Sequence, residues 1–327
     1  MKMSEMKKCI AVSGALMLAL VLLYGGFRML KSTAFQTDPG TVQTGMRQTI
    51  VRDGVEYFPR QDVTVVLLTG IGETGPVQDS GSRRNCGEAD MVSLLIFDKG
   101  AQKLNILSLN RDTMLDIQSP DLNGKSAGTG YGQLALAHTY GSGLEDSSEN
   151  LRNTVSAFLY GANIDYYVTL NMDAIALLND AVGGVTVTVV DDFSQADPTI
   201  PTGEVTLQGQ QAVSFVCARE GVGSQLSLSR MERHKEYMSG FMEALKSRLE
   251  IDPGFASGVY EDVCGYMVTD CSVKVQSLLL KQCGQYSLGQ IVTIAGEYAE
   301  DGQSTEYYVN QEDLDRVILE YLYAPKK

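Results

Sequence analysis

The sequence predicts a layered α-β-α domain with a central mixed sheet, preceded by one N-terminal transmembrane helix. Three observations lead to this prediction. Apolar runs of strand length alternate with helix-like segments between residues 62 and 250. One long charge-free apolar stretch lies near the N-terminus, and no second one follows it. The 327 residues suffice for one large domain with attachments, or for two small domains.

The N-terminal segment divides into a tail, an apolar span and a linker. Residues 1–8 carry three lysines and one glutamate, and residues 9–27 carry no charge. A span of that length just crosses a hydrocarbon core of ~30 Å. A cleaved signal peptide is the alternative, but it needs a shorter apolar core and a small-residue cleavage site. We favour an uncleaved anchor with a cytoplasmic N-terminus, because lysines precede the span. Residues 28–61 are polar and are expected to form an extracytoplasmic stalk.

The first half of the domain is predicted from its apolar runs. "DVTVVLLTGIG", which begins at Asp62, is apolar on both faces and fits a buried strand. "MVSLLIF" and "KLNILSL" are separated by "DKGAQ", which predicts a hairpin. "SSENLRNTVSAFLYG" predicts a helix capped by Ser147 or Ser148 and ended by Gly161.

The second half continues the alternation of strands and helices. "DYYVTL" and "VTVTVV" are predicted strands, and "NMDAIALLNDAVGG" between them is a predicted helix with an asparagine start and a glycine stop. "VSFVCA" fits a short helix-to-strand segment, and apolar residues from Leu226 onward recur at helical spacing up to Asp252. Residues 251–327 are expected to pack on the domain as an extension, with a helix around "SVKVQSLLLKQ" and a last helix capped by Asn310.

Composition excludes some classes of function. The net charge of −14 argues against a nucleic-acid partner, since a phosphate backbone needs a surplus of lysine and arginine facing it. His138 and His234 stand far apart, so a His-rich metal site is not expected. Cys264 and Cys271 are close enough in sequence for a disulfide, although free buried thiols explain them equally well.

The candidate chemistry lies where the apolar runs stop. Arg111 and Asp112 follow the strand "LNILSL" directly, and ligands of α/β proteins gather at strand ends. The alternative is a structural ion pair that fixes a loop. Arginine binds phosphate oxygens through paired hydrogen bonds, and carboxylates can hold Mg²⁺ against the same phosphates. Further charged residues near element ends are Arg83, Arg84, Asp90, Arg219, Arg230 and Arg233.

The order of these pieces resembles the LytR-CpsA-Psr family of cell-envelope proteins, over roughly residues 62–250 and the anchor before them. The most specific pieces are "NRDTMLDI" and "IDYYVTLNMDAIALLNDAVGGV", which occur in order. The resemblance implies a transferase of the cell membrane in a Gram-positive type of envelope. Such an enzyme moves a glycopolymer from a polyprenyl diphosphate carrier to peptidoglycan, and uses Mg²⁺, a ring of arginines and a hydrophobic tunnel for the lipid.

Matching motif by motif assigns roles to individual residues. Arg111 and Asp112 match the catalytic "RDT" motif, Asp90 matches a metal ligand, and Arg219, Arg230 and Arg233 match diphosphate contacts. The first metal aspartate of the family falls on Gly72, and Glu73 next to it is the expected substitute. Arg83 and Arg84 are expected to replace the arginine that falls on Glu88. Other family positions that differ here are Gln133, Cys217, His234 and Lys235.

These departures leave three functional hypotheses. The first is an active Mg²⁺-dependent glycopolymer transferase. The second is a degenerate relative that binds a lipid-linked glycan or diphosphate as a regulator or scaffold. The third is a surface-interaction domain whose motifs serve only the fold. Met231, Met238, Phe241 and Met242 line either a prenyl-chain channel or simply the core, and a Cys86–Cys217 disulfide is a further idea left open.

Overall fold

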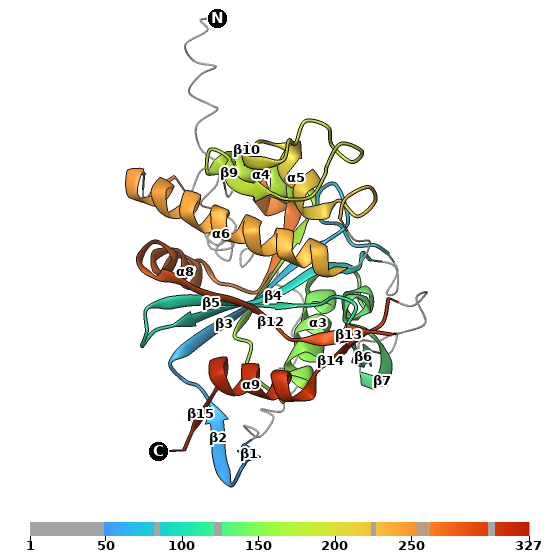
Figure 1. Cartoon of the computed structure of the whole chain (residues 1–327). Coiled ribbons are helices and arrows are strands. Elements are labelled where there is room, and N and C mark those ends of the chain that lie inside the picture. The colour runs from blue at the N-terminus through green and yellow to red at the C-terminus, as the bar shows by residue number, and fades with distance from the viewer. Residues whose placement is uncertain are drawn as a thin grey trace, which may run out of the picture. The chain divides into compact units, whose positions relative to one another are not determined.

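The structure is a computed structural model, and its elements are drawn in Figure 1. The residues that it describes are 49–81, 86–120, 126–223, 227–252, 254–255, 259, 262–299 and 305–326. The predicted tail, the predicted anchor over 9–27 and most of the predicted stalk lie outside them. None of the helices in the described ranges has both the length and the hydropathy that crossing a bilayer requires.

The fold is mixed α/β. A six-stranded mixed sheet lies at its centre, with the strand order β11-β8-β3-β4-β5-β12. The predicted hairpin is confirmed, because β4 and β5 pair antiparallel with Val92 opposite Leu109 and Asp98 opposite Lys103. The strands are β3 Val63–Ile71, β4 Ala89–Asp98, β5 Lys103–Leu109, β8 Tyr166–Asn171, β11 Met267–Thr269 and β12 Ser287–Thr293. The further prediction of helical layers on both faces stays a prediction.

The described chain divides into two compact units. Unit 1 contains residues 70–77 and 169–288, and unit 2 contains residues 49–69, 78–168 and 289–326. Both units therefore use chain from the segment after residue 250, and β12 brings part of that segment into the central sheet. The domain boundaries drawn from the sequence at residues 61/62 and 250/251 stay a prediction.

Unit 2 holds the β4–β5 hairpin and several smaller pieces around it. Residues 50–59, assigned to the stalk in the sequence analysis, form two strands that pair with each other and with the C-terminal strand. Its further elements are β1 Ile50–Arg52, β2 Val55–Pro59, β6 Met114–Pro120, β7 Ser126–Gln133, the 3-10 helix η2 Leu134–Thr139, α3 Glu145–Phe158, β13 Gly296–Tyr298, β14 Tyr307–Val309, α9 Gln311–Tyr321 and β15 Tyr323–Pro325.

Helix α3 begins before the predicted cap. Its N-cap is Leu144, and Ser147 is fully buried inside the first turn. The Ser147 hydroxyl accepts a hydrogen bond from the Gly143 backbone N–H at 2.9 Å instead of capping the helix. The predicted glycine stop is confirmed, since Gly161 has a φ of 79° and its N–H donates to the Ser156 carbonyl at 2.8 Å.

Unit 1 is built around one long helix. The prediction of that helix is confirmed by α6 Ser227–Ile251, and the Asn310 cap of α9 in unit 2 is confirmed as well. Gly240 lets α6 approach β9 closely, because a Cβ there would lie 2.2 Å from the Thr186 carbonyl oxygen. The other elements of unit 1 are α4 Asp173–Ala181, β9 Val185–Val189, β10 Gly203–Leu207, α5 Gln210–Cys217, the 3-10 helix η3 Cys264–Tyr266 and α8 Val273–Gln285.

Two predictions in unit 1 were wrong in detail. Asn171 does not cap α4, because it is the last residue of β8 and its side chain donates to the Gly75 carbonyl at 2.8 Å. The segment "VSFVCA" does not change to strand, because residues 210–217 are one helix. Among the described residues, the cysteines at 86, 217, 264, 271 and 283 form no disulfide, so neither of the considered disulfides is present. Burial raises the pKa of the Cys271 thiol to about 12, which makes it unreactive.

Candidate functional site

Residues 110–113 form a buried turn between β5 and β6 in unit 2. Backbone hydrogen bonds hold this turn from two sides. The Ala135 N–H donates to the Arg111 carbonyl at 2.9 Å, and the Tyr307 N–H donates to the Asp112 carbonyl at 2.9 Å. Asn110, Arg111, Asp112 and Thr113 are all buried. The charged pair at the strand end therefore belongs to a fixed internal turn.

Four charged side chains meet at this turn, and we call Glu88, Asp90, Arg111 and Asp112 the Arg111 cluster. Arg111 forms ion pairs with Asp90 through Nη1 and with Glu88 through Nη2, and its Nε lies 3.6 Å from Asp112 Oδ1. The Arg111 side chain is only 7% exposed, whereas Glu88 is 48% exposed and Asp90 is 30% exposed. One positive and three negative charges give the cluster a formal net charge of −2.

The exposure of the two outer acids decides what the Arg111 cluster can do. Charge-assisted pairs between arginine and carboxylate are strong, but pairs open to solvent contribute little net stability. Glu88 and Asp90 can therefore exchange an ion pair for water or for another ligand. Asp112 is 9% exposed and is the inner partner of the arginine. A phosphate that approaches Arg111 has to take the place of Glu88 or Asp90 on the guanidinium.

A second cluster around a buried arginine lies in unit 1, and we call Asp191, Arg233 and His234 the Arg233 cluster. Arg233 donates through Nε to the Phe215 carbonyl at 2.9 Å and through Nη2 to the Ala218 carbonyl, and its Nη1 pairs with Asp191 at 3.0 Å. These carbonyls belong to the C-terminal end of α5, where helix carbonyls lack partners and a positive charge is favourable. Arg233 thus completes the end of a helix.

His234, the next residue of α6, also contacts a carbonyl at the end of α5. Its Nε2 lies 3.0 Å from the Val216 carbonyl oxygen, which fits an N–H donor on that nitrogen. The Arg233 guanidinium carbon also lies 5.7 Å from the centre of the Phe193 ring, a cation–π distance. The end of α5 is therefore covered by a guanidinium and an imidazole from one helix.

The remaining predicted site residues belong to unit 1 or lie outside the described residues. The structure brings Asp90, Arg111 and Asp112 together in unit 2. Arg230 is buried on α6 in unit 1, and Arg219 and Glu73 of the same unit are exposed. Arg83 and Arg84 lie outside the described residues. Among the residues that are described, no three His, Cys, Asp or Glu side chains are grouped as metal ligands.

Two positions that differ from the family motif have partners of their own. Gln133 donates to the Thr305 carbonyl at 3.0 Å and to its hydroxyl at 2.8 Å. Lys235, the other of these positions, pairs with Glu232 at 2.6 Å.

Two residues that bind the Arg111 cluster and the Arg233 side chain were not predicted from the sequence. Tyr298 donates its hydroxyl to Asp112 Oδ2 at 3.0 Å, and Asp191 pairs with Arg233. Asp191 follows a predicted strand directly, so its position at a strand end was a usable signal. Tyr298 lies 186 residues from Asp112, and no local pattern marks it.

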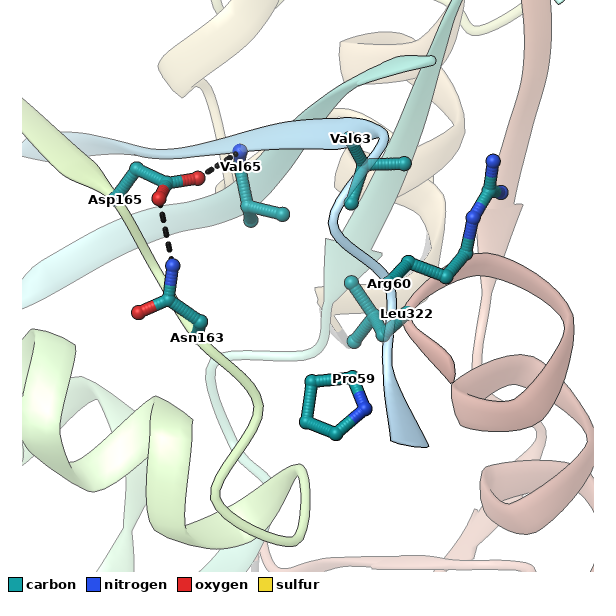
Figure 2. A pocket seen from close by; sticks show the side chains of 7 residues that line it. All are labelled: Pro59, Arg60, Val63, Val65, Asn163, Asp165 and Leu322. Carbon is teal, nitrogen blue, oxygen red and sulfur yellow. Dashed lines mark hydrogen bonds between the residues drawn. The ribbon is translucent and has the colours of Figure 1, made fainter. Parts of the chain in front are cut away.

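A small pocket in unit 2 is not a candidate site, because its polar groups pair with each other (Figure 2). Asp165 accepts from the Val65 N–H at 2.8 Å and from the Asn163 side chain at 2.6 Å. Arg60 is bound to Asp62 and Asp98. The lining residues are Pro59, Arg60, Val63, Val65, Asn163, Asp165 and Leu322.

Comparison with known proteins places these features in a family context. The model of the LytR-CpsA-Psr family matches residues 36–320, a wider range than the 62–250 expected from the motifs. A curated relative, the polyisoprenyl-teichoic acid–peptidoglycan teichoic acid transferase TagU of Oceanobacillus iheyensis, is 26% identical over 321 residues, which is 94% of this chain and 92% of that protein.

Solved structures share the fold at lower identity. Bacillus subtilis TagV has a TM-score of 0.60 at 19% identity, with 80% of this chain and 98% of that chain covered. A structure of TagT with bound octaprenyl pyrophosphate lipid has a TM-score of 0.56 at 22% identity, with 84% of this chain and 95% of that chain covered.

Proposed function

The chain belongs to the LytR-CpsA-Psr family, and on that premise we propose that it is a membrane-anchored extracytoplasmic phosphotransferase. Its proposed reaction moves a glycopolymer from a polyprenyl diphosphate carrier to peptidoglycan. Support comes from the relatives named as teichoic acid transferases and from the structure of TagT with bound octaprenyl pyrophosphate lipid. The proposed location is the cell membrane, with residues 9–27 as a single-pass anchor and a cytoplasmic N-terminus.

One observation carries the proposal to particular residues, namely the buried Arg111 held by two partly exposed acids. The guanidinium offers Nη1 and Nη2 toward Asp90 and Glu88, on the side where its partners reach solvent. A diphosphate that replaces these acids would receive paired hydrogen bonds from one planar group. Arg111 is the proposed diphosphate ligand, with Arg83, Arg84, Arg219, Arg230 and Arg233 as further proposed contacts.

Arg233 is the weakest member of that proposed set. It donates to two backbone carbonyls and pairs with Asp191, and its side chain is 6% exposed. Binding a phosphate with this side chain would leave the end of α5 without its donor. We therefore assign Arg233 first to the stability of unit 1, and only then to the ligand.

Mg²⁺ belongs to the proposal because the donor set of the Arg111 cluster suits it. Asp90 is a carboxylate of this cluster that lies on the guanidinium and is 30% exposed. Mg²⁺ is commonly held by one or two carboxylates together with substrate phosphates, so a group of three protein ligands is not required. Asp90, with Glu73 as the second predicted ligand, would hold the ion, which would neutralise charge on the diphosphate.

The proposed step exchanges one phosphorus–oxygen bond for another. The acceptor hydroxyl oxygen of peptidoglycan bonds to the phosphorus that carries the glycan, and the bond from that phosphorus to the bridging oxygen breaks. Polyprenyl phosphate leaves with the bridging oxygen, and the hydroxyl proton passes to a carboxylate, which the proposal assigns to Asp112. Arg111 stabilises the charge that develops on the phosphoryl oxygens, a contribution of charge and positioning.

A second candidate function is a relative that binds the lipid-linked glycan without transferring it. The observation that favours it is Glu88, an acid at a position where the family motif has an arginine. An extra carboxylate beside a diphosphate opposes binding and charge neutralisation. Loss of such a cation contact typically slows electrostatic catalysis by about 10²-fold or more.

The test is transfer of labelled glycan by the full chain in lipid vesicles. The reaction contains polyprenyl diphosphate-linked glycan, Mg²⁺ and purified peptidoglycan. The transferase proposal expects label in the peptidoglycan fraction and equimolar release of polyprenyl phosphate. Binding of the lipid without transfer supports the second candidate, and neither binding nor transfer refutes both. Undiminished transfer in the presence of a chelator removes the metal role from Asp90 and Glu73.

A further inference from the structure

The hairpin of β13 and β14 lies directly on the turn that carries Arg111 and Asp112. Both belong to unit 2. The Tyr307 N–H donates to the Asp112 carbonyl at 2.9 Å, and Thr113 forms a parallel bridge with Tyr307. The segment after residue 250, for which the sequence predicted packing alone, therefore reaches the Arg111 cluster.

Tyr298 of this hairpin touches the predicted catalytic carboxylate. Its hydroxyl donates to Asp112 Oδ2 at 3.0 Å and accepts from Asn110 Nδ2 at 3.1 Å. The Asn110 donor occupies the hydroxyl oxygen, so the phenol hydrogen is directed to Asp112. Asn110 Oδ1 in turn accepts from the Asp112 N–H at 3.0 Å. Asp112 is thereby held at two points, by the hydrogen bond of its backbone N–H to Asn110 and by the hydrogen bond of its Oδ2 to Tyr298.

The Tyr298 ring is itself held in place. It meets the Tyr307 ring edge-on with centroids 5.1 Å apart, and the buried Tyr307 donates its hydroxyl to the Ile294 carbonyl at 3.1 Å. Residue 296 has to be glycine for the hairpin to close, because a Cβ there would lie 2.4 Å from the Tyr308 carbonyl oxygen. A rigid hairpin thus presents the hydroxyl at a defined position.

We propose that Tyr298 is a positioning residue that orients Asp112 and, through it, Arg111. With Oδ2 held by Tyr298, Oδ1 is the oxygen turned to Arg111 Nε, at 3.6 Å. That distance is an ion-pair distance and too long for a hydrogen bond, so Asp112 acts on the Nε edge through its charge, while Nη1 and Nη2 bind Asp90 and Glu88 on the side where a ligand would enter. The inference rests on the proposed function for its link to catalysis, and the chain of contacts itself lies within unit 2.

The test compares Tyr298→Phe with Tyr308→Phe. Both changes remove one hydroxyl from the same hairpin, but the exposed Tyr308 donates its hydroxyl to Glu306 at 2.8 Å. Tyr298→Phe is expected to lower kcat for glycan transfer about tenfold, because the ring remains and the orientation of Asp112, the assigned proton acceptor, is lost. In an Asp112→Asn background the same change is expected to cost nothing further, since the two residues act as one unit.

Two outcomes would overturn the inference. One is an equal kcat for Tyr298→Phe and Tyr308→Phe. The other is an additive effect of Tyr298→Phe in the Asp112→Asn background, which would make its role a general structural one.

A readout without turnover separates this inference from the proposed function. The Arg111 Nε–H resonance of ¹⁵N-arginine-labelled protein reports the orientation of the guanidinium in the absence of substrate. The inference expects that resonance to shift and exchange faster in Tyr298→Phe and to stay unchanged in Tyr308→Phe. If the wild-type chain transfers no glycan, the proposed function fails, but the positioning role of Tyr298 can still be tested with this resonance. A resonance that does not respond to Tyr298→Phe refutes the positioning role.

Discussion

The two buried arginine clusters use the same side chain in opposite ways. Arg111 in unit 2 is bound by carboxylates, of which Glu88 and Asp90 reach solvent. Arg233 in unit 1 is bound by two carbonyls at the end of α5 and by Asp191. A carboxylate at the surface can be exchanged for a ligand, whereas a helix end cannot move away. The family motif groups both arginines as diphosphate contacts, but their partners separate a ligand-binding role from a structural one.

The largest effect in this comparison is expected for the stability of Arg233→Ala. The change leaves Asp191 and two helix carbonyls without their buried donor, which typically costs about 3–5 kcal/mol. Urea unfolding of the variant measures the loss. Arg316→Ala is the matched control, because Arg316 is 53% exposed and its pairs should contribute about 0–1 kcal/mol. Equal losses in the two variants would contradict the structural role of Arg233.

Arg111→Ala is expected to act on activity rather than on folding. Transfer should fall by about 10²–10³-fold, because one preorganised electrostatic contact to the phosphoryl oxygens is lost. Arg111→Lys should give an intermediate rate, since it keeps the charge and loses the planar pair of donors. Initial rates with labelled glycan measure both. A rate for Arg111→Ala within twofold of wild type would assign the pair Arg111–Asp112 to the structural alternative.

Glu88→Gln tests whether the Arg111 cluster binds a diphosphate. The Glu88 carboxylate repels the phosphates, although solvent partly screens this repulsion. Removing its charge should therefore tighten binding of a prenyl diphosphate by about tenfold. Calorimetric titration of the variant and the wild type measures the change. Glu320→Gln, a change on the exposed Arg316 pair, should leave the affinity unaltered. Weaker binding by Glu88→Gln would mean that Glu88 supports the ligand.

The smallest effect is expected for His234→Ala. The change removes one hydrogen bond to the Val216 carbonyl and should lower the free energy of unfolding by about 1 kcal/mol. Lys235→Ala on the next residue serves as the comparison, since its pair with the 69% exposed Glu232 contributes little. Thermal unfolding of the two variants would show the ranking, and a larger loss for Lys235→Ala would argue against His234 as a cap.

The sequence predicted the elements whose signal is local. The strands β3, β4 and β5 are long apolar runs buried in the sheet, and α6 has a helical apolar period over 25 residues. The hairpin of β6 and β7 was missed because "SAGTGYGQ" is small and polar and has no strand pattern. The predicted start of α3 was wrong because the Ser147 hydroxyl binds the backbone of the preceding loop and does not cap the helix.

The site was predictable as a set of residues but not as a set of contacts. Arg111, Asp112 and Asp90 were found because they follow or precede apolar strands. Their partners are non-local, since Glu88 lies 23 residues before Arg111 and Tyr298 lies 186 residues after Asp112. The opposite roles of Arg111 and Arg233 depend on what surrounds each guanidinium, and residue type alone does not encode that.

Binding of octaprenyl diphosphate to the wild-type chain and to Arg111→Ala, titrated in detergent micelles with Mg²⁺, tests the central claim most directly. If Arg111 is the exchangeable arginine at the ligand, the wild type binds and the variant binds at least about 100-fold more weakly, a loss of roughly 2.7 kcal/mol. Equal dissociation constants for the two proteins would contradict the account.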